Sequence, residues 1–496
     1  MLLRSTCSRT AQPLSCISRT RPSAIMPLRA RINNQSFSDM PSEQPGDEPN
    51  DVLFKSHYGV RTIELNRPKK LNSLNGSMAR KILPRLREWE KSQLANVIVL
   101  KGNGRALCAG GDVAALAKDN KSGPEGQQRS KDYFELEYKL DHTIATYSKP
   151  YVAFMDGITM GGGVGLSVHA PFRIATENTV FAMPETTIGF FPDVGASFFL
   201  PRMDGSVGTY LALTSAQIKG VNVFLAGIAT HYLDSSSLPD LEARLAELNF
   251  GDDVSYNTRL SIINDTIEEF TTGMPHDVPQ HFSTNVRIAI DYCFQEVFNI
   301  DQIMEALQGS EEREDSPPDV KKWAAETRAT IAQRSPTSVK VALSQLRRGA
   351  QWNIAQTFQN EHNIASKFME HPDFVEGVSA RLIHKPAQTP KWSKTSFDDV
   401  SESEVNSFFA DELKLQLPNT GGDSNYSDYP HAWTGLPRQK EIETFVKSSP
   451  RSDFQGVIDH FVRTRGGKMG VREKVDEVLT RKTSPADNKR GFVWND

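Results

Sequence analysis

The chain has 496 residues, of which 38% are hydrophobic and 24% charged, and its formal net charge is −4. At about 100–200 residues per domain, this length is sufficient for two to four structural units. No stretch approaches the roughly 20 consecutive apolar residues that cross a bilayer, so no membrane span is predicted. The four cysteines, two of them in the first sixteen positions, are too few and too clustered for a disulfide scaffold.

The N-terminal segment has a composition of its own. Residues 1–38 contain six arginines and many Ser and Thr, but no acidic residue. This pattern is typical of a mitochondrial transit peptide, with a merely disordered tail as the alternative. Its removal would take the net charge from −4 to −10, which is unlike a general nucleic-acid-binding protein. Residues 39–50, rich in Pro, Glu, Asp and Gly, are expected to be a linker.

An alternation of strands and helices follows the linker. Hydrophobic patterning predicts a helix over Met78–Lys91 and strands over Gly59–Leu65, Asn96–Leu100, Tyr151–Met155, Phe172–Ala175 and Thr179–Ala182. Strand, helix, strand is the order of an α/β protein. We therefore expect an α/β core over residues 51–235.

The second half of the chain is expected to be mostly helical. Residues 236–408 carry helical patterns over Leu238–Leu248, Thr284–Val297, Val320–Ala332, Ser338–Leu346 and Ile354–Met369. Residues 409–496 are more polar and form a C-terminal extension that is expected to be partly disordered.

The first segment that could take part in binding or catalysis is Cys108-Ala109-Gly110-Gly111-Asp112. It follows a strand and precedes a predicted helix, so Asp112 could simply cap that helix. Alternatively, the small residues expose backbone N–H groups, notably that of Gly111, at a positive helix end. The residues alone leave both interpretations open.

The second segment is the glycine cluster at residues 160–166, MGGGVGL. Glycines at a strand-to-helix turn allow a ligand to approach the backbone closely, and bare N–H groups can bind developing negative charge. The spacing is neither a dinucleotide-binding fingerprint nor a P-loop. Tight packing of helix against sheet is the alternative.

Three acidic residues complete the set of candidates. Glu185 and Asp193 lie in an apolar loop without Lys or Arg, where raised pKa values would suit acid–base chemistry. Capping of neighbouring helices is the alternative for both. Glu137 falls on the apolar stripe of a predicted helix over Tyr133–Tyr147 and should point inward.

Taken together, these segments resemble the crotonase superfamily, and within it the mitochondrial 3-hydroxyisobutyryl-CoA hydrolases of valine breakdown. The similarity covers about residues 51–408 and includes the runs at 108–112, 160–170, 181–202, 335–343 and 373–392. It implies a spiral of ββα turns with a helical C-terminal part. It also implies that an acyl-CoA thioester carbonyl lies between the backbone N–H groups of Gly111 and Gly162.

One position separates the activities within this superfamily. Enoyl-CoA hydratases resemble this layout but use two glutamates, and this chain has Gly165 at the first of those positions. By resemblance, Glu185 is then the catalytic carboxylate, acting as nucleophile through an acyl–enzyme anhydride or as general base for water. Asp193 would bind the substrate's 3-hydroxyl and assist proton transfer, and Glu137 would be a further substrate contact. An enoyl-CoA hydratase or isomerase is the less favoured alternative.

No metal or separate cofactor is expected, because CoA is part of the substrate. The expected location is the mitochondrial matrix. Residues 438–496 contain thirteen Lys and Arg against nine Asp and Glu. The basic stretch Arg463–Lys482 is interpreted as a solvated face or as a docking tail. Fungal mitochondrial proteins similar to this one are regarded as components of the small mitochondrial ribosomal subunit, so a structural role is carried beside the enzymatic one.

Overall fold

The computed structural model describes residues 41–251, 253–275, 277–410, 415–449, 453–485 and 492–495. The predicted transit peptide, residues 1–38, lies outside this part of the chain. Residues 42–496 form one unit. No helix within the described ranges is both long and apolar enough to cross a membrane.

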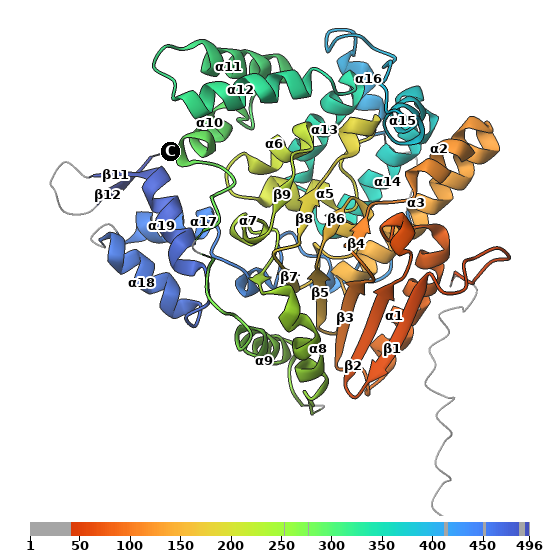
Figure 1. Ribbon diagram of the computed structural model, residues 1–496, viewed down its shortest axis with the longest axis vertical. Coiled ribbons are helices and arrows are strands. Elements are labelled where there is room, and N and C mark those ends of the chain that lie inside the picture. The colour runs from red at the N-terminus through yellow and green to blue at the C-terminus, as the bar shows by residue number, and fades with distance from the viewer. Residues whose placement is uncertain are drawn as a thin grey trace, which may run out of the picture. The chain divides into compact units, whose positions relative to one another are not determined.

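A six-stranded sheet forms the first layer of the core (Figure 1). Its order is β1-β2-β3-β5-β7-β10, with bounds Val52–His57, Val60–Leu65, Val97–Gly102, Tyr151–Met155, Phe172–Ala175 and His231–Tyr232. Strands β1 and β2 are antiparallel, and every later neighbour is parallel. Parallel neighbours need crossover connections, which the helices supply.

A second, four-stranded sheet has the order β4-β6-β8-β9, with bounds Ala106–Ala109, Ile158–Met160, Val180–Ala182 and Ile218–Lys219. Strands β3, β5 and β7 of the first sheet are each followed by a strand of the second, namely β4, β6 and β8. Helices then follow β4 and β6: α2 (Val113–Lys121), α3 (Pro124–Ala145) and α4 (Gly162–Gly165). This repeated order confirms the expected spiral of ββα turns.

Alternation along β3 explains how the first sheet is covered. Val97 and Val99 face one side, where they pack with residues of α8 (Leu238–Ala246) and α9 (Tyr256–Glu268). Ile98 and Leu100 face the other side and join the main core with α1 (Gly76–Lys91). Because successive side chains of a strand point to opposite faces, a continuous apolar run buries both.

Helices make up most of the second half of the described chain, as predicted. Up to residue 408 these are, after α8 and α9, the helices Thr284–Cys293 (α10), Ile300–Glu312 (α11), Pro318–Ile331 (α12), Pro336–Gly349 (α13), Ile354–Glu370 (α14), Pro372–Val378 (α15) and Glu402–Ser407 (α16). Three shorter helices precede them, Ala196–Phe199 (α5), Val207–Thr214 (α6) and Val221–Leu225 (α7). Helix α14 packs along α3, and α13 packs against α5 and α6. These contacts bring the helical half against the loops that follow the second sheet.

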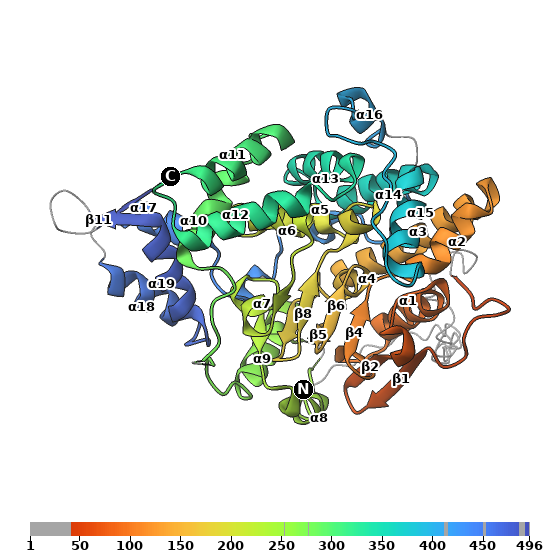
Figure 2. The same ribbon diagram turned by 45° about the horizontal axis from the view of Figure 1, so that its top comes forward.

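The C-terminal extension folds onto the core and contains α17 (Gln439–Ser448), α18 (Phe454–Thr464), α19 (Val471–Lys482) and the antiparallel pair β11 (Thr483–Pro485) and β12 (Phe492–Trp494). Helix α19 lies beside α10 in both views (Figure 2). The valines Val471, Val475 and Val478 of α19 are fully buried. The described part of the extension is therefore integrated into the core's packing.

Ion pairs account for much of the basic character of this extension. Lys468 binds Glu268 at 2.6 Å, and Lys474 binds Asp204 at 2.7 Å. Arg481, also buried, binds an aspartate of α10 at 2.9 Å. The interpretation of the stretch 463–482 as a solvated face is therefore wrong for these three cations. The sequence could not reveal it, because the acidic partners lie about 190–270 residues earlier in the chain.

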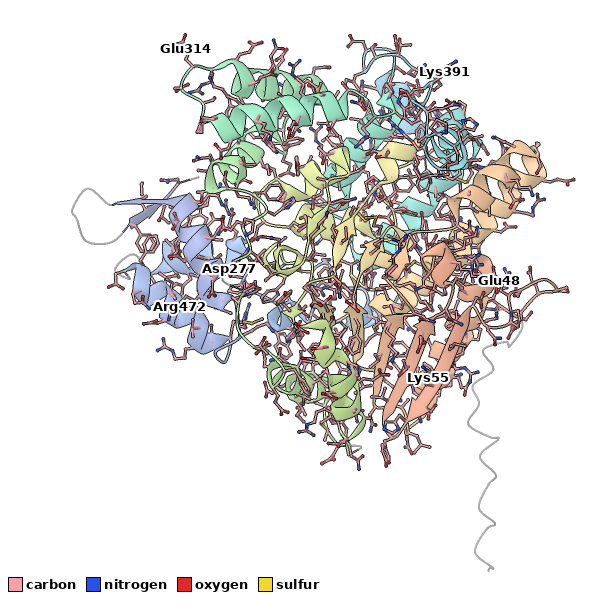
Figure 3. The ribbon with its side chains drawn as sticks, in the orientation of Figure 1. Glu48, Lys55, Asp277, Glu314, Lys391 and Arg472 are labelled. Carbon is pink, nitrogen blue, oxygen red and sulfur yellow. The ribbon has the colours of Figure 1, made fainter. Side chains whose placement is uncertain are left out.

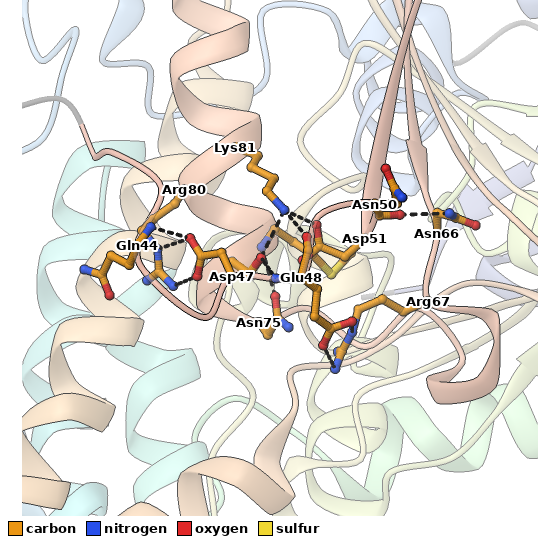
Figure 4. Close-up of polar contacts among 12 residues, drawn as sticks. Gln44, Asp47, Glu48, Asn50, Asp51, Asn66, Arg67, Asn75, Arg80 and Lys81 are labelled. Atoms are coloured by element: carbon orange, nitrogen blue, oxygen red, sulfur yellow. Dashed lines mark hydrogen bonds and ion pairs between the residues drawn. The ribbon is translucent and has the colours of Figure 1, made fainter.

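Hydrogen bonds and ion pairs connect the acidic segment before β1 to α1 (Figure 4). Asp47 accepts from the Arg80 guanidinium, and the Lys81 ammonium donates both to the Glu48 carbonyl oxygen and, at 2.6 Å, to buried Asp51. From its composition, this segment was expected to be a linker without buried contacts. The partners of its charges are cations on the next helix.

Candidate active site

The loop after β4 exposes a backbone donor. Leu74 pairs with Gly111 in an isolated bridge in which Leu74 N–H donates to Gly110 and Asp112 N–H donates to Leu74. The Gly111 N–H takes no part in that bridge. The Asp112 side chain does not cap α2; it binds the Arg67 guanidinium at 3.2 Å. The capping interpretation is thus wrong, and Asp112 instead anchors the loop that carries the Gly111 N–H.

A second backbone donor lies at the start of α4. Gly161, with φ of +44°, makes a turn that suits glycine, and Gly162 is the first residue of the helix. First-turn N–H groups have no acceptor inside their own helix. A Cβ placed on Gly162 would lie 3.4 Å from the Gly111 nitrogen and 2.7 Å from Glu137 Oε1. The two glycines therefore meet, as the resemblance implied, with a carboxyl group directly beside them.

Glu185 approaches the same turn from the loop after β8. Its Oε1 lies 2.9 Å from the position of a Cβ on Gly161, and its Oε2 has no hydrogen-bond partner within the described chain. The side chain of Glu185 caps neither end of the short 3₁₀ turn 185–188, and α5 begins after Gly195 without a side-chain cap. The capping alternative for Glu185 and Asp193 is therefore wrong.

The three predicted acids share one buried environment, since each is at most 5% exposed. Burial, and next the charge of Asp193, raises the pKa of both Glu137 and Glu185 well above the usual value. Burial raises the pKa of Asp193 to about 7, opposed by the Tyr138 hydroxyl, which donates to its Oδ2 at 2.7 Å. Close carboxyl groups in a dry site cannot all be ionised, so protons are shared among them at neutral pH.

A fourth acid, Asp141, explains why position 165 is glycine. Asp141 is fully buried, and neither carboxyl oxygen has a hydrogen-bond partner within the described ranges. A Cβ on Gly165 would lie 2.5 Å from Asp141 Oδ2 and 2.7 Å from the Val194 Cβ. Burial, and next the charge of Glu137, raises the pKa of Asp141 well above its usual value. The space in which a side chain at position 165 would begin is therefore filled by an acid from α3.

Sequence reasoning missed Asp141, Tyr138 and Glu361. Asp141 lies one helical turn after Glu137 on the same face of α3, so the stripe that identified Glu137 could also have found it. Glu361 lies in α14 and accepts from Gly195 N–H at 2.7 Å and from Ser197 N–H at 2.9 Å. No local signal in the sequence connects it with a loop about 165 residues earlier.

Known proteins are similar to this chain to different extents. Residues 60–409 match the enoyl-CoA hydratase/isomerase family model. The small ribosomal subunit protein mS47 of Neurospora crassa is 54% identical over 509 residues, covering 100% of this chain and 99% of its own length. The mitochondrial 3-hydroxyisobutyryl-CoA hydrolase of Gallus gallus is 41% identical over 374 residues, covering 74% of this chain and 92% of its own length.

A crystal structure of a carnitinyl-CoA dehydratase from Mycobacterium thermoresistibile matches with a TM-score of 0.65 and 32% identity, covering 75% of this chain and 99% of its own. The family match ends at residue 409, so most of the extension lies beyond it, whereas the Neurospora crassa protein matches along the whole chain. The chain belongs to the enoyl-CoA hydratase/isomerase family, to which it adds a C-terminal extension.

Proposed function

We propose that this protein hydrolyses the thioester of 3-hydroxyisobutyryl-CoA to 3-hydroxyisobutyrate and CoA. Hydrolases named for this substrate are about 40% identical to the chain and are themselves mitochondrial. We place the activity in the mitochondrial matrix, as a step of valine breakdown. The substrate is an acyl-CoA, and water is the only other reactant.

The juxtaposition of two glycine N–H groups and the Glu185 carboxyl group carries this proposal. A thioester carbonyl between Gly111 and Gly162 would receive two hydrogen bonds, which strengthen as its oxygen becomes negative in the transition state. The Glu185 Oε1 atom lies 2.9 Å from the position of a Cβ on Gly161, beside these donors, and we assign this carboxyl group the attack on the carbonyl carbon or the activation of water. The ionised form of a buried carboxyl group with a raised pKa is a stronger base and nucleophile than a solvated one.

The chemistry has two routes. In the first, Glu185 forms a bond to the carbonyl carbon, the C–S bond breaks, CoA leaves as its thiol after protonation, and water then hydrolyses the mixed anhydride. In the second, Glu185 takes a proton from water as the water attacks the carbonyl carbon, after which the C–S bond breaks and CoA again leaves as its thiol after protonation. Asp193, with a pKa of about 7, gains and releases protons near neutral pH and is suited to proton transfer in either route. We assign it the substrate's 3-hydroxyl as well, and Glu137 a further contact.

Position 165 argues against hydration of a double bond. That reaction, in this family's layout, uses a second glutamate where this chain has Gly165. Asp141 occupies the space at this position, yet it belongs to another element and projects from α3. The arrangement therefore favours a single bond-making carboxylate, Glu185.

The matched pair Glu185→Gln and Glu137→Gln tests the assignment. Each change removes one buried carboxyl group from the same site while keeping side-chain size. Glu185→Gln should lower kcat for 3-hydroxyisobutyryl-CoA by about 10²–10⁴-fold, the usual range for a positioned acid–base group. Glu137→Gln should act mainly on KM. Equal and small effects of both changes on kcat would remove Glu185 from the bond-making role.

We propose, as a second function, that the chain is a component of the small mitochondrial ribosomal subunit. The similarity to the Neurospora crassa subunit protein mS47 supports this role, because it runs along the whole chain, including the residues after 409, where the family match ends. The two functions are compatible, since a docked protein can keep its active site.

Surface charge offers a test of docking. Arg463 and Arg472 are exposed on the extension, and Figure 3 marks Arg472 there, with Lys55 and Lys391 on other parts of the surface. Arg463→Glu with Arg472→Glu should weaken co-sedimentation with small mitochondrial subunits, whereas Lys55→Glu with Lys391→Glu, a matched control, should not. Binding should also fall steeply as salt rises, because phosphate contacts release counterions. Full-length protein that never co-sediments, even at low salt, would contradict the ribosomal role.

A further inference from the structure

The backbone after Asp193 adopts an unfavourable conformation. Val194 has φ of +55°, and Gly195 follows with φ of +87°. A β-branched residue at positive φ is rare, because its side chain crowds the backbone. Such strain persists only where surrounding groups hold it. The direction in which the Asp193 carboxyl group points therefore depends on what fixes residues 193–195.

Two buried side chains hold this turn from opposite ends. Glu361 of α14 accepts the Gly195 N–H at 2.7 Å. His169, which is fully buried, bonds the Val194 carbonyl oxygen through Nε2 at 3.0 Å. Its ring lies so close that a Cβ on Gly195 would approach Nε2 to 2.1 Å. The imidazole and the Glu361 carboxyl group thus bind the two polar groups of the same peptide unit directly.

The other ring nitrogen of His169 reaches the C-terminal extension. Its Nδ1 lies 2.8 Å from the Tyr429 hydroxyl oxygen. Burial lowers the pKa of His169 to about 4, so the ring is neutral at physiological pH, with one donor and one acceptor nitrogen. The Val194 carbonyl can only accept, so Nε2 must carry the proton, and Nδ1 accepts from Tyr429. By donating to Nδ1, the Tyr429 hydroxyl therefore stabilises the tautomer whose Nε2–H holds the Val194 carbonyl.

Tyr429 is itself fixed in place by its own segment. Its ring packs edge-on against Phe198 at 4.9 Å between ring centroids. Before it, the Tyr426 hydroxyl donates to the Ala145 carbonyl at 3.0 Å, and after it, the Thr434 hydroxyl donates to Pro171 at 2.8 Å. All of these extension residues lie beyond residue 409, where the family match ends.

We propose that Tyr429 is a positioning residue of the hydrolase site, acting through His169 and the Val194 carbonyl to orient Asp193. The inference rests on the proposed role of Asp193 and deepens it. The extension is then part of the active-site scaffold as well as a surface for assembly. A change in the position of residues 426–434 would therefore alter the conformation of the loop that carries Asp193, through the His169 ring.

Tyr429→Phe tests this chain of contacts, with Tyr426→Phe as the matched control. Each change removes one hydroxyl group from a half-buried ring of the same segment, but only Tyr429 contacts His169. Tyr429→Phe should lower kcat for 3-hydroxyisobutyryl-CoA by about 10- to 100-fold, the scale of a misplaced catalytic group. Isobutyryl-CoA, which lacks the 3-hydroxyl, should be affected less. Tyr426→Phe loses a hydrogen bond of the segment but keeps the contact between Tyr429 and His169, so it should lower turnover of either substrate much less than Tyr429→Phe does.

A measurement on the ring itself separates this inference from the hydrolase proposal. In ¹⁵N-histidine-labelled protein, long-range ¹H–¹⁵N spectra should show His169 protonated at Nε2 and a loss of that single tautomer in Tyr429→Phe. In His169→Gln, the side-chain amide can donate to the Val194 carbonyl, and its N–H donors do not depend on a hydrogen bond from Tyr429. Adding Tyr429→Phe to His169→Gln should therefore have little further effect on turnover.

Several outcomes are decisive. A single Nε2-protonated tautomer and unchanged turnover in Tyr429→Phe would overturn the inference, as would additive effects in the double variant. If the unmodified chain lacked thioesterase activity, the hydrolase proposal would fail, while the tautomer measurement would still decide whether Tyr429 sets the state of His169.

Discussion

Asp193 should destabilise the folded chain at alkaline pH, so replacing it by asparagine should be stabilising there. Burial raises its pKa to about 7 from 3.8. Between these values, the folded chain keeps a proton at this site that the unfolded chain has released. The free energy of unfolding therefore falls as pH rises through about 4 to 7, because the unfolded state binds fewer protons.

The size of the effect follows from the two pKa values. At about 1.36 kcal/mol per pH unit, a pKa raised from 3.8 to about 7 corresponds to roughly 4 kcal/mol of lost stability once the pH exceeds 7. This loss of stability is an upper bound for Asp193, because the neighbouring carboxyl groups share the proton that the site binds. Asparagine keeps an oxygen that can accept the Tyr138 hydroxyl, so the hydrogen bond at 2.7 Å need not be lost.

Denaturant unfolding of the wild type and Asp193→Asn at pH 5, 7 and 9 measures this difference. The stability advantage of the variant should grow by roughly 2–3 kcal/mol between pH 5 and pH 9. Asp204→Asn is the matched control. Burial opposes the shift, but the Lys474 ammonium at 2.7 Å holds the pKa of Asp204 below its usual value, so this variant should lose stability above about pH 4. A pH-independent difference for Asp193→Asn, or a variant less stable than wild type at pH 9, would refute the reasoning.

Three further changes give distinct outcomes. Gly165→Ala places a Cβ 2.5 Å from Asp141 Oδ2 and should lower the free energy of unfolding by about 1–3 kcal/mol. Adding Asp141→Ala to the same chain should reduce this cost. Additive costs of the two changes would contradict the contact. Gly162→Pro removes one oxyanion donor and should lower kcat by about 10²–10³-fold; folded variant protein with normal kcat would leave the glycine cluster a packing role only. Lys81→Met leaves buried Asp51 unpaired and should cost about 3–5 kcal/mol by denaturant unfolding, and a cost below about 1 kcal/mol would contradict a stabilising role of this ion pair.

The fold was predictable to a large extent because its signals are local. Strands β5 and β7 have the predicted bounds, since their apolar runs are closed by turn residues on both sides. The short strands of the second sheet were harder to predict. Strand β6, only Ile158–Met160, has too few residues to establish a period, and its existence depends on neighbours from other turns of the spiral.

The candidate site was predictable where a motif is contiguous and not where it depends on long-range contacts. Gly111, Gly162 and Glu185 come from short runs whose glycines or unpaired acids stand out in the sequence. His169 shows the opposite case. It lies within the run 160–170, but its role depends on Tyr429, 260 residues later, and on the backbone conformation of Val194. Neither contact has a sequence signature.

Thiol release from 3-hydroxyisobutyryl-CoA, measured beside hydration of crotonyl-CoA on the same purified chain, tests the central claim most directly. With Gly165 in place of a second glutamate and Glu185 beside the paired glycines, we predict rapid release of CoA from the first substrate and little hydration of the second. Efficient hydration of crotonyl-CoA without thiol release from 3-hydroxyisobutyryl-CoA would contradict the account.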